Sequence, residues 1–226
     1  MKRISKGLLG IAVLLGAVAA AQAQVTIIND DLNANTVGNV TAGYTFGDVA
    51  NATHTYQPVG VGGSVGALVS SDFIPPGVGY GGVAYQYQVG NTGGINTSPN
   101  MADYTLEFDA LVNKTGGGFG LIFQAWSGAG FSGTFSSSSY PSELYPATAN
   151  AFQHFVFNLG TFNPGADPTG LTWQFAWQMD EFTYGGPGTG NQMVIDNIKV
   201  TMVPEPASLA LCGVGALALV LRRRKA

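Results

Sequence analysis

The sequence predicts an all-β fold, an antiparallel β-sandwich that covers residues 24–202. Glycine is abundant, with 33 of 226 residues, and no long segment shows helical periodicity. Short runs of β-branched and aromatic residues lie between turn-forming residues instead. Eight or more such runs without an intervening helix favour two packed antiparallel sheets around one core.

The expected strands can be justified in chain order. They cover residues 25–28, 64–70, 83–89, 104–112, 119–126, 152–159, 171–179 and 193–203. The clearest is 104–112, where alternate residues from Tyr104 to Val112 are apolar and so share one face. Trp173 and Trp177 share a face in the same way, which predicts core packing for both. Residues 113–118 predict a hairpin turn, and 91–100, 128–146 and 183–191 predict long loops.

The preferred topology is a jelly roll, because the first and last strands of that arrangement often lie near each other. A β-helix is the alternative, but the sequence shows no fixed repeat of residue type. No cysteine lies in residues 24–202, since the single one is Cys212. The domain must therefore be stabilised by core packing without a disulfide.

The N-terminus has the pattern of a secretory signal peptide, residues 1–23. Basic Lys2, Arg3 and Lys6 precede an apolar stretch that predicts a signal helix, and Ala21 and Ala23 form a small-x-small cleavage site. Signal peptidase would then leave Gln24 as the first residue of the mature chain.

The C-terminus, residues 203–226, holds a second targeting pattern. The motif Val203-Pro204-Glu205-Pro206 precedes an apolar run, 207–221, and a basic stop of Arg222, Arg223, Arg224 and Lys225. The run predicts a transmembrane helix, although it is shorter than the roughly 20 residues of a full crossing. The basic stop should remain cytoplasmic, which places residues 24–202 outside the inner membrane.

This tail resembles the PEP-CTERM sorting signal of Gram-negative bacteria. The resemblance implies that an exosortase, a membrane peptidase, cuts near Pro204-Glu205-Pro206 after a transient stay in the inner membrane. It also implies a final location at the cell surface, in the outer envelope or in an extracellular matrix of exopolysaccharide or biofilm. A plain tail anchor without processing is the alternative.

Charge separates the two ends from the domain between them. From Gln24 to Pro206 the only basic residues are Lys114 and Lys199, whereas all 13 acidic residues of the chain lie there. The net charge of that part is about −11, and it has no arginine. Because such a surface repels phosphate backbones, nucleic-acid binding is excluded as a function class.

Catalytic patterns are weak in this sequence. Glu107 with Asp109, or Asp180 with Glu181, could form the paired carboxylates of a glycan hydrolase or lyase. A solvated strand face explains the first pair more simply, and a soluble strand end explains the second. We therefore expect no enzyme and assign no catalytic residue.

Asp196 is a candidate metal ligand. In residues 193–200, strand alternation places it with Val194 and Ile198 on an apolar face, where a carboxylate needs a cation or several hydrogen bonds. The segment resembles the closing strand of carbohydrate-binding-module-like and galactose-binding-like jelly rolls. That resemblance implies a structural calcium ion held by Asp196 with Asn29 and Asp31. The alternative is an Asp bonded to turn amides.

Aromatic residues next to the expected loops are candidate platforms for sugar rings. They are Trp126, Tyr140, Tyr145 and Tyr184. The favoured function is a non-enzymatic, exported envelope or matrix protein, and a carbohydrate-binding module that contacts polysaccharide through these rings is the alternative. A secreted glycan hydrolase or lyase is the third possibility.

Overall fold

The computed structural model describes residues 24–34, 43–47, 52–71, 80–89, 98–113, 118–163, 166–180 and 191–203. The signal peptide with Ala21 and Ala23, the tail from Pro204 onward and Tyr184 lie outside these residues, as do both predicted flanking helices. Among the described residues, no helix has the length and apolar character that spanning a membrane requires. Residues 26–202 form one compact unit.

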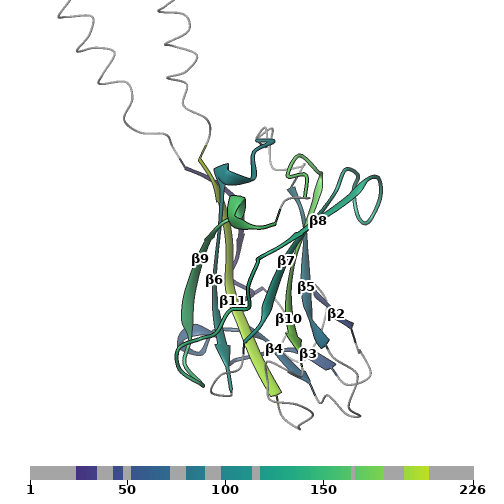
Figure 1. The fold of residues 1–226 in the computed structure, drawn as a ribbon. Helices are drawn as coiled ribbons and strands as arrows, with labels where there is room; N and C mark the ends of the chain where they lie inside the picture. Colours follow the sequence, from purple (N-terminus) through teal and green to yellow (C-terminus); the bar gives the residue numbers. More distant parts are fainter. Residues whose placement is uncertain are drawn as a thin grey trace, which may run out of the picture. The chain divides into compact units, whose positions relative to one another are not determined.

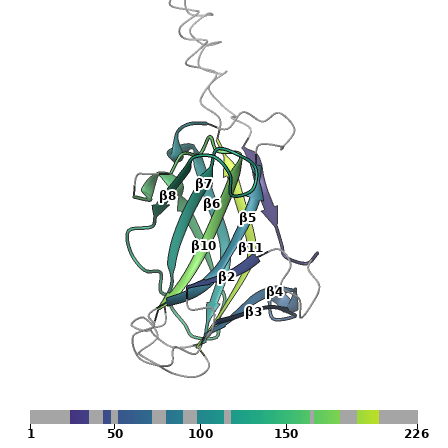
Figure 2. The ribbon, with the colours of Figure 1, turned by 90° about the vertical axis from the view of Figure 1, so that its right-hand side faces the viewer.

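Two antiparallel β-sheets face each other across the core, which confirms the predicted sandwich (Figures 1 and 2). Sheet A has the order β3 (Ala52–Gln57), β4 (Gly66–Ser71), β11 (Asn191–Met202), β6 (Tyr104–Val112) and β9 (Gln153–Asn158), and β1 (Val25–Asp30) also pairs with β11. Sheet B has the order β2 (Gly43–Gly47), β5 (Tyr80–Gln88), β10 (Thr172–Asp180), β7 (Gly120–Trp126) and β8 (Phe135–Ser139). Short 3-10 helices η1 (Val61–Gly63), η3 (Met101–Asp103) and η4 (Leu159–Thr161) lie between strands.

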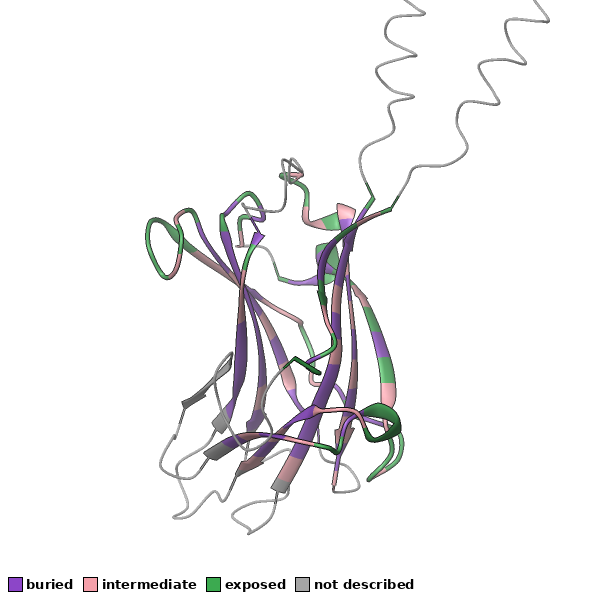
Figure 3. Cartoon of the chain, turned by 180° about the vertical axis from the view of Figure 1, so that it is seen from behind, coloured by how far each residue is buried: buried purple, intermediate pink, exposed green. Residues whose placement is uncertain are grey.

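The core forms where alternating apolar residues of the two sheets meet, and Figure 3 marks buried residues along the strands of both sheets. Every second residue of β6 from Tyr104 to Val112 is buried, as predicted. Trp173 and Trp177 of β10 are fully buried, which confirms their assignment to the core. Phe108 of β6 meets Trp177 edge to face, with ring centroids 5.3 Å apart, and so links the two sheets.

The predicted hairpin at residues 113–118 is wrong. β6 pairs with β11 and β9 in sheet A, whereas β7 pairs with β10 and β8 in sheet B. The segment between them therefore crosses from one sheet to the other. A glycine-rich turn is compatible with a hairpin within one sheet and with a crossover between two sheets. Turn residues indicate that the chain changes direction, but they do not indicate which strand the next one pairs with.

The sequence also missed three strands. β2 and β3 were not expected, and β8 lies inside the stretch 128–146 that was predicted as a loop. The β8 sequence Phe-Ser-Ser-Ser-Ser has almost no apolar alternation, because β8 is the outer strand of sheet B and buries only Ser138 of its five residues. Its outer edge is covered by a later segment, where Asn163 N donates to Ser139 O at 2.8 Å and Asp167 N to Ser136 Oγ at 2.8 Å.

A buried polar cluster joins β3 of sheet A to β5 of sheet B. His54 Nε2 lies 2.8 Å from the hydroxyl of Tyr85, and both side chains are shielded from solvent. Burial lowers the pKa of His54 to about 4, so the ring is uncharged at neutral pH. Burial, followed by a hydrogen bond with Tyr56, raises the pKa of Tyr85 far above its usual range. The cluster is therefore a neutral hydrogen-bonded part of the core.

Candidate functional site

The outer face of sheet B carries a row of three amide side chains and one serine hydroxyl that runs across four strands. In the strand register, Gln174 of β10 lies opposite Gln86 of β5 on one side and Gln124 of β7 on the other. Gln124 in turn lies opposite Ser137 of β8. We name these four residues the amide row. The described side chains of this face include no charged group.

Hydrogen bonds fix part of the amide row. Gln174 Nε2 donates to Gln124 Oε1. Gln86 Nε2 is shielded from solvent and has no hydrogen-bond partner among the described residues. A buried amide donor without a partner is unfavourable.

Aromatic rings border the amide row at one end of sheet B. Trp126, at the end of β7, packs against Phe131 and Phe135 with ring centroids 5.0 and 5.1 Å apart. Trp126 is 9% exposed, whereas Phe131 is 59% and Phe135 is 52% exposed. We name these three residues the aromatic end. Trp126 is thus largely buried against the two Phe rings, and these rings form the exposed surface of the aromatic end.

The loop between β7 and β8 holds Phe131 in place. Ser127 N donates to Thr134 O at 3.0 Å, and Thr134 N donates back to Ser127 Oγ at 2.8 Å. Gly130 and Gly133 have φ values of 62° and 80°, a conformation that glycine adopts without strain. The loop therefore presents an exposed ring on a backbone that is already ordered.

The structure separates the predicted aromatic platforms. Tyr140 follows β8 at the other end of β7, where its backbone N donates to Leu121 O, and its ring packs against Phe157 and Phe162. Tyr145 lies beside Leu144, which bridges to Phe119 before β7, and its hydroxyl bonds Glu143. Neither residue lies with Trp126.

Sequence reasoning missed Phe131 and Phe135. The signal that could have found Phe135 is the pairing of β8 with β7, which places it directly opposite Trp126. That pairing is not readable from a Ser-rich segment.

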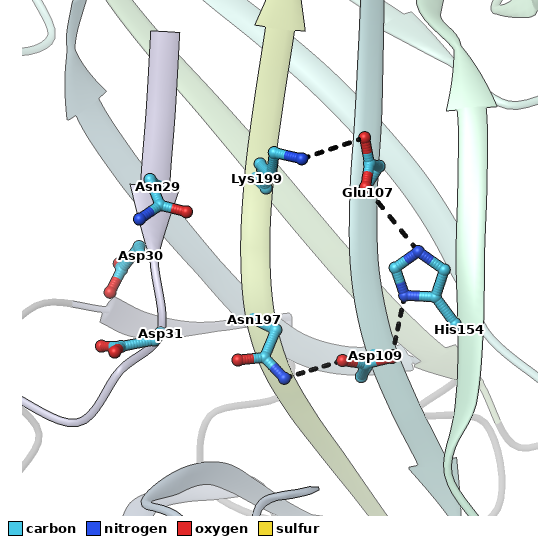
Figure 4. Close-up of a pocket in the computed structure, with 8 residues that line it drawn as sticks. All are labelled: Asn29, Asp30, Asp31, Glu107, Asp109, His154, Asn197 and Lys199. Carbon is cyan, nitrogen blue, oxygen red and sulfur yellow. Dashed lines mark hydrogen bonds and ion pairs between the residues drawn. The ribbon is translucent and has the colours of Figure 1, made fainter. Parts of the chain in front are cut away.

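A second polar site lies on the outer face of sheet A, in a hollow of about 210 Å³ (Figure 4). Its lining side chains come from β1, β11, β6 and β9, together with the residue that follows β1. They are Asn29, Asp30, Asp31, Glu107, Asp109, His154, Asn197 and Lys199. We name this site the acidic hollow.

The carboxylates of the acidic hollow on β6 already have partners within the protein. His154 lies between them, with Nδ1 3.0 Å from Asp109 Oδ1 and Nε2 3.8 Å from Glu107 Oε2. Asn197 Nδ2 donates to Asp109 Oδ2 at 2.7 Å, and Lys199 Nζ lies 3.5 Å from Glu107 Oε1. Each carboxylate oxygen has a partner, so this pair is arranged as a hydrogen-bonded surface network and not as a free acid and base.

The predicted calcium ligands do not come together. Asp196 is fully buried, but it lies opposite Asp109 in the register, on the outer face of sheet A. A β-bulge between Asp196 and Lys199, with Asn197 at φ 53°, shifts the alternation that the sequence assumed. Ile198 and Val200 therefore enter the core while Asp196 does not share their face.

The segment around η1 covers Asp196 and supplies its hydrogen bonds. Val61 N donates to Asp196 Oδ2 at 2.8 Å, Ser64 Oγ lies 2.8 Å from the same oxygen, and Asn197 N donates to Oδ1 at 2.8 Å. Asn29 and Asp31 line the acidic hollow instead. This donor set fits the alternative of an Asp bonded to turn amides, and the calcium site stays a prediction. Across the described residues, no group of three or more His, Cys, Asp or Glu side chains is placed to hold a metal ion.

Comparison with known proteins identifies the tail and places the fold. Residues 203–225 match the family described as the PEP-CTERM protein-sorting motif. No curated protein sequence matches the chain.

The solved structures that resemble the chain are jelly-roll proteins of low sequence identity. A putative sugar-binding protein from Bacteroides thetaiotaomicron is 10% identical with a TM-score of 0.51, over 78% of this chain and 99% of that chain. The family 30 carbohydrate-binding module of a Clostridium thermocellum cellulosomal cellulase is 16% identical with a TM-score of 0.49, over 80% and 98%. A match to xylanase 10B of Clostridium thermocellum, 11% identical with a TM-score of 0.48, covers 80% of this chain and 29% of that chain. The sorting motif and the jelly-roll fold are thus established.

Proposed function

We propose that this chain is an exported, non-enzymatic protein that binds a neutral polysaccharide on the outer face of sheet B. The observation that carries the proposal is the uncharged amide row that runs into the exposed rings of the aromatic end. The structurally similar protein from Bacteroides thetaiotaomicron is described as a putative sugar-binding protein, which supports this proposal.

The chemistry of this surface suits a sugar polymer. Amide side chains donate and accept hydrogen bonds at the same time, which matches the paired hydroxyl groups of a sugar ring. Exposed Phe rings offer flat apolar surfaces for the C–H face of a sugar, as aromatic residues do in many small-molecule sites. Gln86 Nε2 is a further amide donor of this row, and no described group of the chain accepts from it.

Charge selects the class of polysaccharide. The domain contains two lysines and no arginine, and Lys199 is paired with Glu107 on sheet A. An acidic glycan would bring carboxylates to an acidic protein without a cation to receive them. The amide row therefore favours an uncharged glycan.

The glycan-binding proposal is tested by affinity electrophoresis in gels that contain neutral or uronate-rich polysaccharides. Replacing Phe131 and Phe135 with Ala should weaken retention by a neutral polysaccharide about tenfold or more, about 1.4 kcal/mol, because the exposed rings are lost. Unfolding temperature should change little, since both side chains are largely exposed.

Tyr145→Ala is the matched control, because Tyr145 is 54% exposed and lies at the other end of β7. It should leave retention unchanged. Equal retention of the wild-type protein and the double variant would contradict the proposal, and so would retention by uronate-rich polymers alone.

We place the protein at the cell surface, in the outer envelope or in an extracellular matrix of exopolysaccharide or biofilm of a Gram-negative bacterium. Support comes from the PEP-CTERM match at residues 203–225. In this proposal signal peptidase cuts after Ala23, the tail helix holds the precursor in the inner membrane, and an exosortase cuts near Pro204-Glu205-Pro206.

Mass spectrometry of the protein recovered from cells and from medium checks this route. We expect a mature N-terminus at Gln24 and a C-terminus close to Pro204-Glu205-Pro206, in surface or medium fractions. A chain that keeps Arg222 to Lys225 in the inner-membrane fraction would indicate an unprocessed tail anchor instead.

A catalytic role is not part of the proposal. Glu107 and Asp109 are the described pair of carboxylates that most resembles a glycosidase acid and base, and each is engaged by His154 and a second side chain. Asp180 is the last residue of β10, and Glu181 lies outside the described residues. The observations favour recognition of the polymer and not its cleavage.

A further inference from the structure

We propose that β9 pairs with the β9 strand of a second copy of this chain, which joins two A sheets into one continuous sheet. The proposal rests on the open edge of β9, on its lack of charge and on its self-complementary sequence. It does not depend on the proposed glycan surface, which lies on sheet B.

The first observation is that β9 has an unpaired edge. β9 is the outer strand of sheet A in Figure 1, and among the described strands it pairs only with β6. In the described part of the chain, no backbone group of residues 153–157 bonds to anything outside this pairing. The outer strand of sheet B differs, because Asn163 and Asp167 bond to residues of β8.

The second observation is that β9 lacks the features that keep natural edge strands apart. Its sequence, Gln-His-Phe-Val-Phe-Asn, contains no Pro, no Lys and no carboxylate. Its pairing with β6 shows no bulge. Val156, near its centre, is 58% exposed on the outer face. A long, uncharged edge of this kind is a template for another strand.

The third observation explains why the partner is a second copy. Two chains that each carry about −11 repel each other over most of their surfaces. The β9 edge carries no carboxylate, lysine or arginine, and the carboxylates of Glu107 and Asp109 lie one strand further in, bound to His154, Lys199 and Asn197. A two-fold contact along β9 therefore brings no carboxylates face to face.

The strand sequence also matches itself when it runs antiparallel. With the two-fold axis at Val156, each Val156 faces its counterpart, His154 faces Asn158, and Phe155 faces Phe157. The last pair would extend the stack that Phe155 and Phe157 form with Phe108, whose centroids lie 5.3 and 6.0 Å away. Directly opposed Cβ atoms in such a pair lie about 4.5–5.5 Å apart.

Cysteine crosslinking of the full chain in producing cells tests this geometry. Cys212 is the only native cysteine, so Val156→Cys is made together with Cys212→Ser and treated with a short bis-maleimide. We expect a crosslinked species at twice the chain mass as the main product. Leu171→Cys with Cys212→Ser is the matched control, because Leu171 is a 44% exposed apolar residue before β10 of sheet B.

Three results would overturn the proposal. They are no crosslink from Val156→Cys, equal crosslinking of both variants, and a crosslink to a different protein. A second measurement keeps the test independent of cysteine chemistry. Sedimentation of the protein purified from its own cells should give a dimer that Val156→Lys converts to a monomer. A wild-type monomer at the concentration in those cells would contradict the pairing, while the Phe131 and Phe135 test would stand unaffected.

Discussion

Replacing Trp177 with Ala is expected to lower the free energy of unfolding by about 3–5 kcal/mol, the range for large-to-small changes of buried aromatic residues. Trp177 is fully buried and touches Phe108 of the opposite sheet and Tyr85 of the neighbouring strand, with ring centroids 5.3 and 6.1 Å apart. The variant loses both ring contacts and leaves a cavity between the sheets. Urea unfolding followed by Trp fluorescence and circular dichroism measures the change.

Leu171→Ala is the control for this prediction. Leu171 is next to the same strand but 44% exposed, so its loss should change stability by about 0.5 kcal/mol or less. A Trp177→Ala protein as stable as this control would mean that the two sheets do not pack as described. With no disulfide in the domain, no covalent link would hide the effect.

The second large effect is expected for Asp196→Ala, which should lower the free energy of unfolding by roughly 3 kcal/mol. The carboxylate is fully buried and accepts bonds from Val61 N, Asn197 N and the Ser64 hydroxyl. Alanine would remove the acceptor of two backbone N–H groups, those of Val61 and Asn197, and of the partly buried Ser64 hydroxyl. It would also free the η1 segment, where Gly60 approaches Asp196 so closely that an added Cβ would lie 2.5 Å from Oδ2.

Asp31→Ala separates this explanation from a calcium site. Asp31 is exposed and its side chain accepts one local bond, from Asn33 N at 3.1 Å. If turn amides hold Asp196, the Asp31 variant should unfold within about 0.5 kcal/mol of the wild type, and EDTA should leave the melting temperatures of all three proteins unchanged. If Asp31 and Asp196 share a calcium ion, both variants and EDTA should lower the melting temperature together.

The strands with one buried face could be predicted, and their partners could not. In β6 every second residue from Tyr104 to Val112 is apolar and faces the core, so the sequence alone predicts both the strand and its buried face. Whether β7 pairs with β6 or joins the other sheet depends on contacts far away in the chain. The Gly-rich turn before β7 contains no such information, and for that reason the hairpin prediction failed.

The candidate site was predictable only in part, for a related physical reason. Trp126 stands out in the sequence, yet Phe131 and Phe135 become part of one surface only when β8 folds back on β7. Asp196 was correctly singled out as a buried carboxylate. Its face was misplaced because Asn197 adopts a left-handed backbone conformation that strict alternation cannot represent.

The position of β11 in sheet A has a consequence for the order of folding. β11 is the last of the described strands, and β1, β4 and β6 all pair with it. These three strands come earlier in the sequence, so a chain that emerges N-terminus first exposes them before their common partner is present. Such long-range pairing slows folding. Sheet A can therefore be completed only once residues 191–202 are available, whereas the strands of sheet B do not depend on β11 for their pairing.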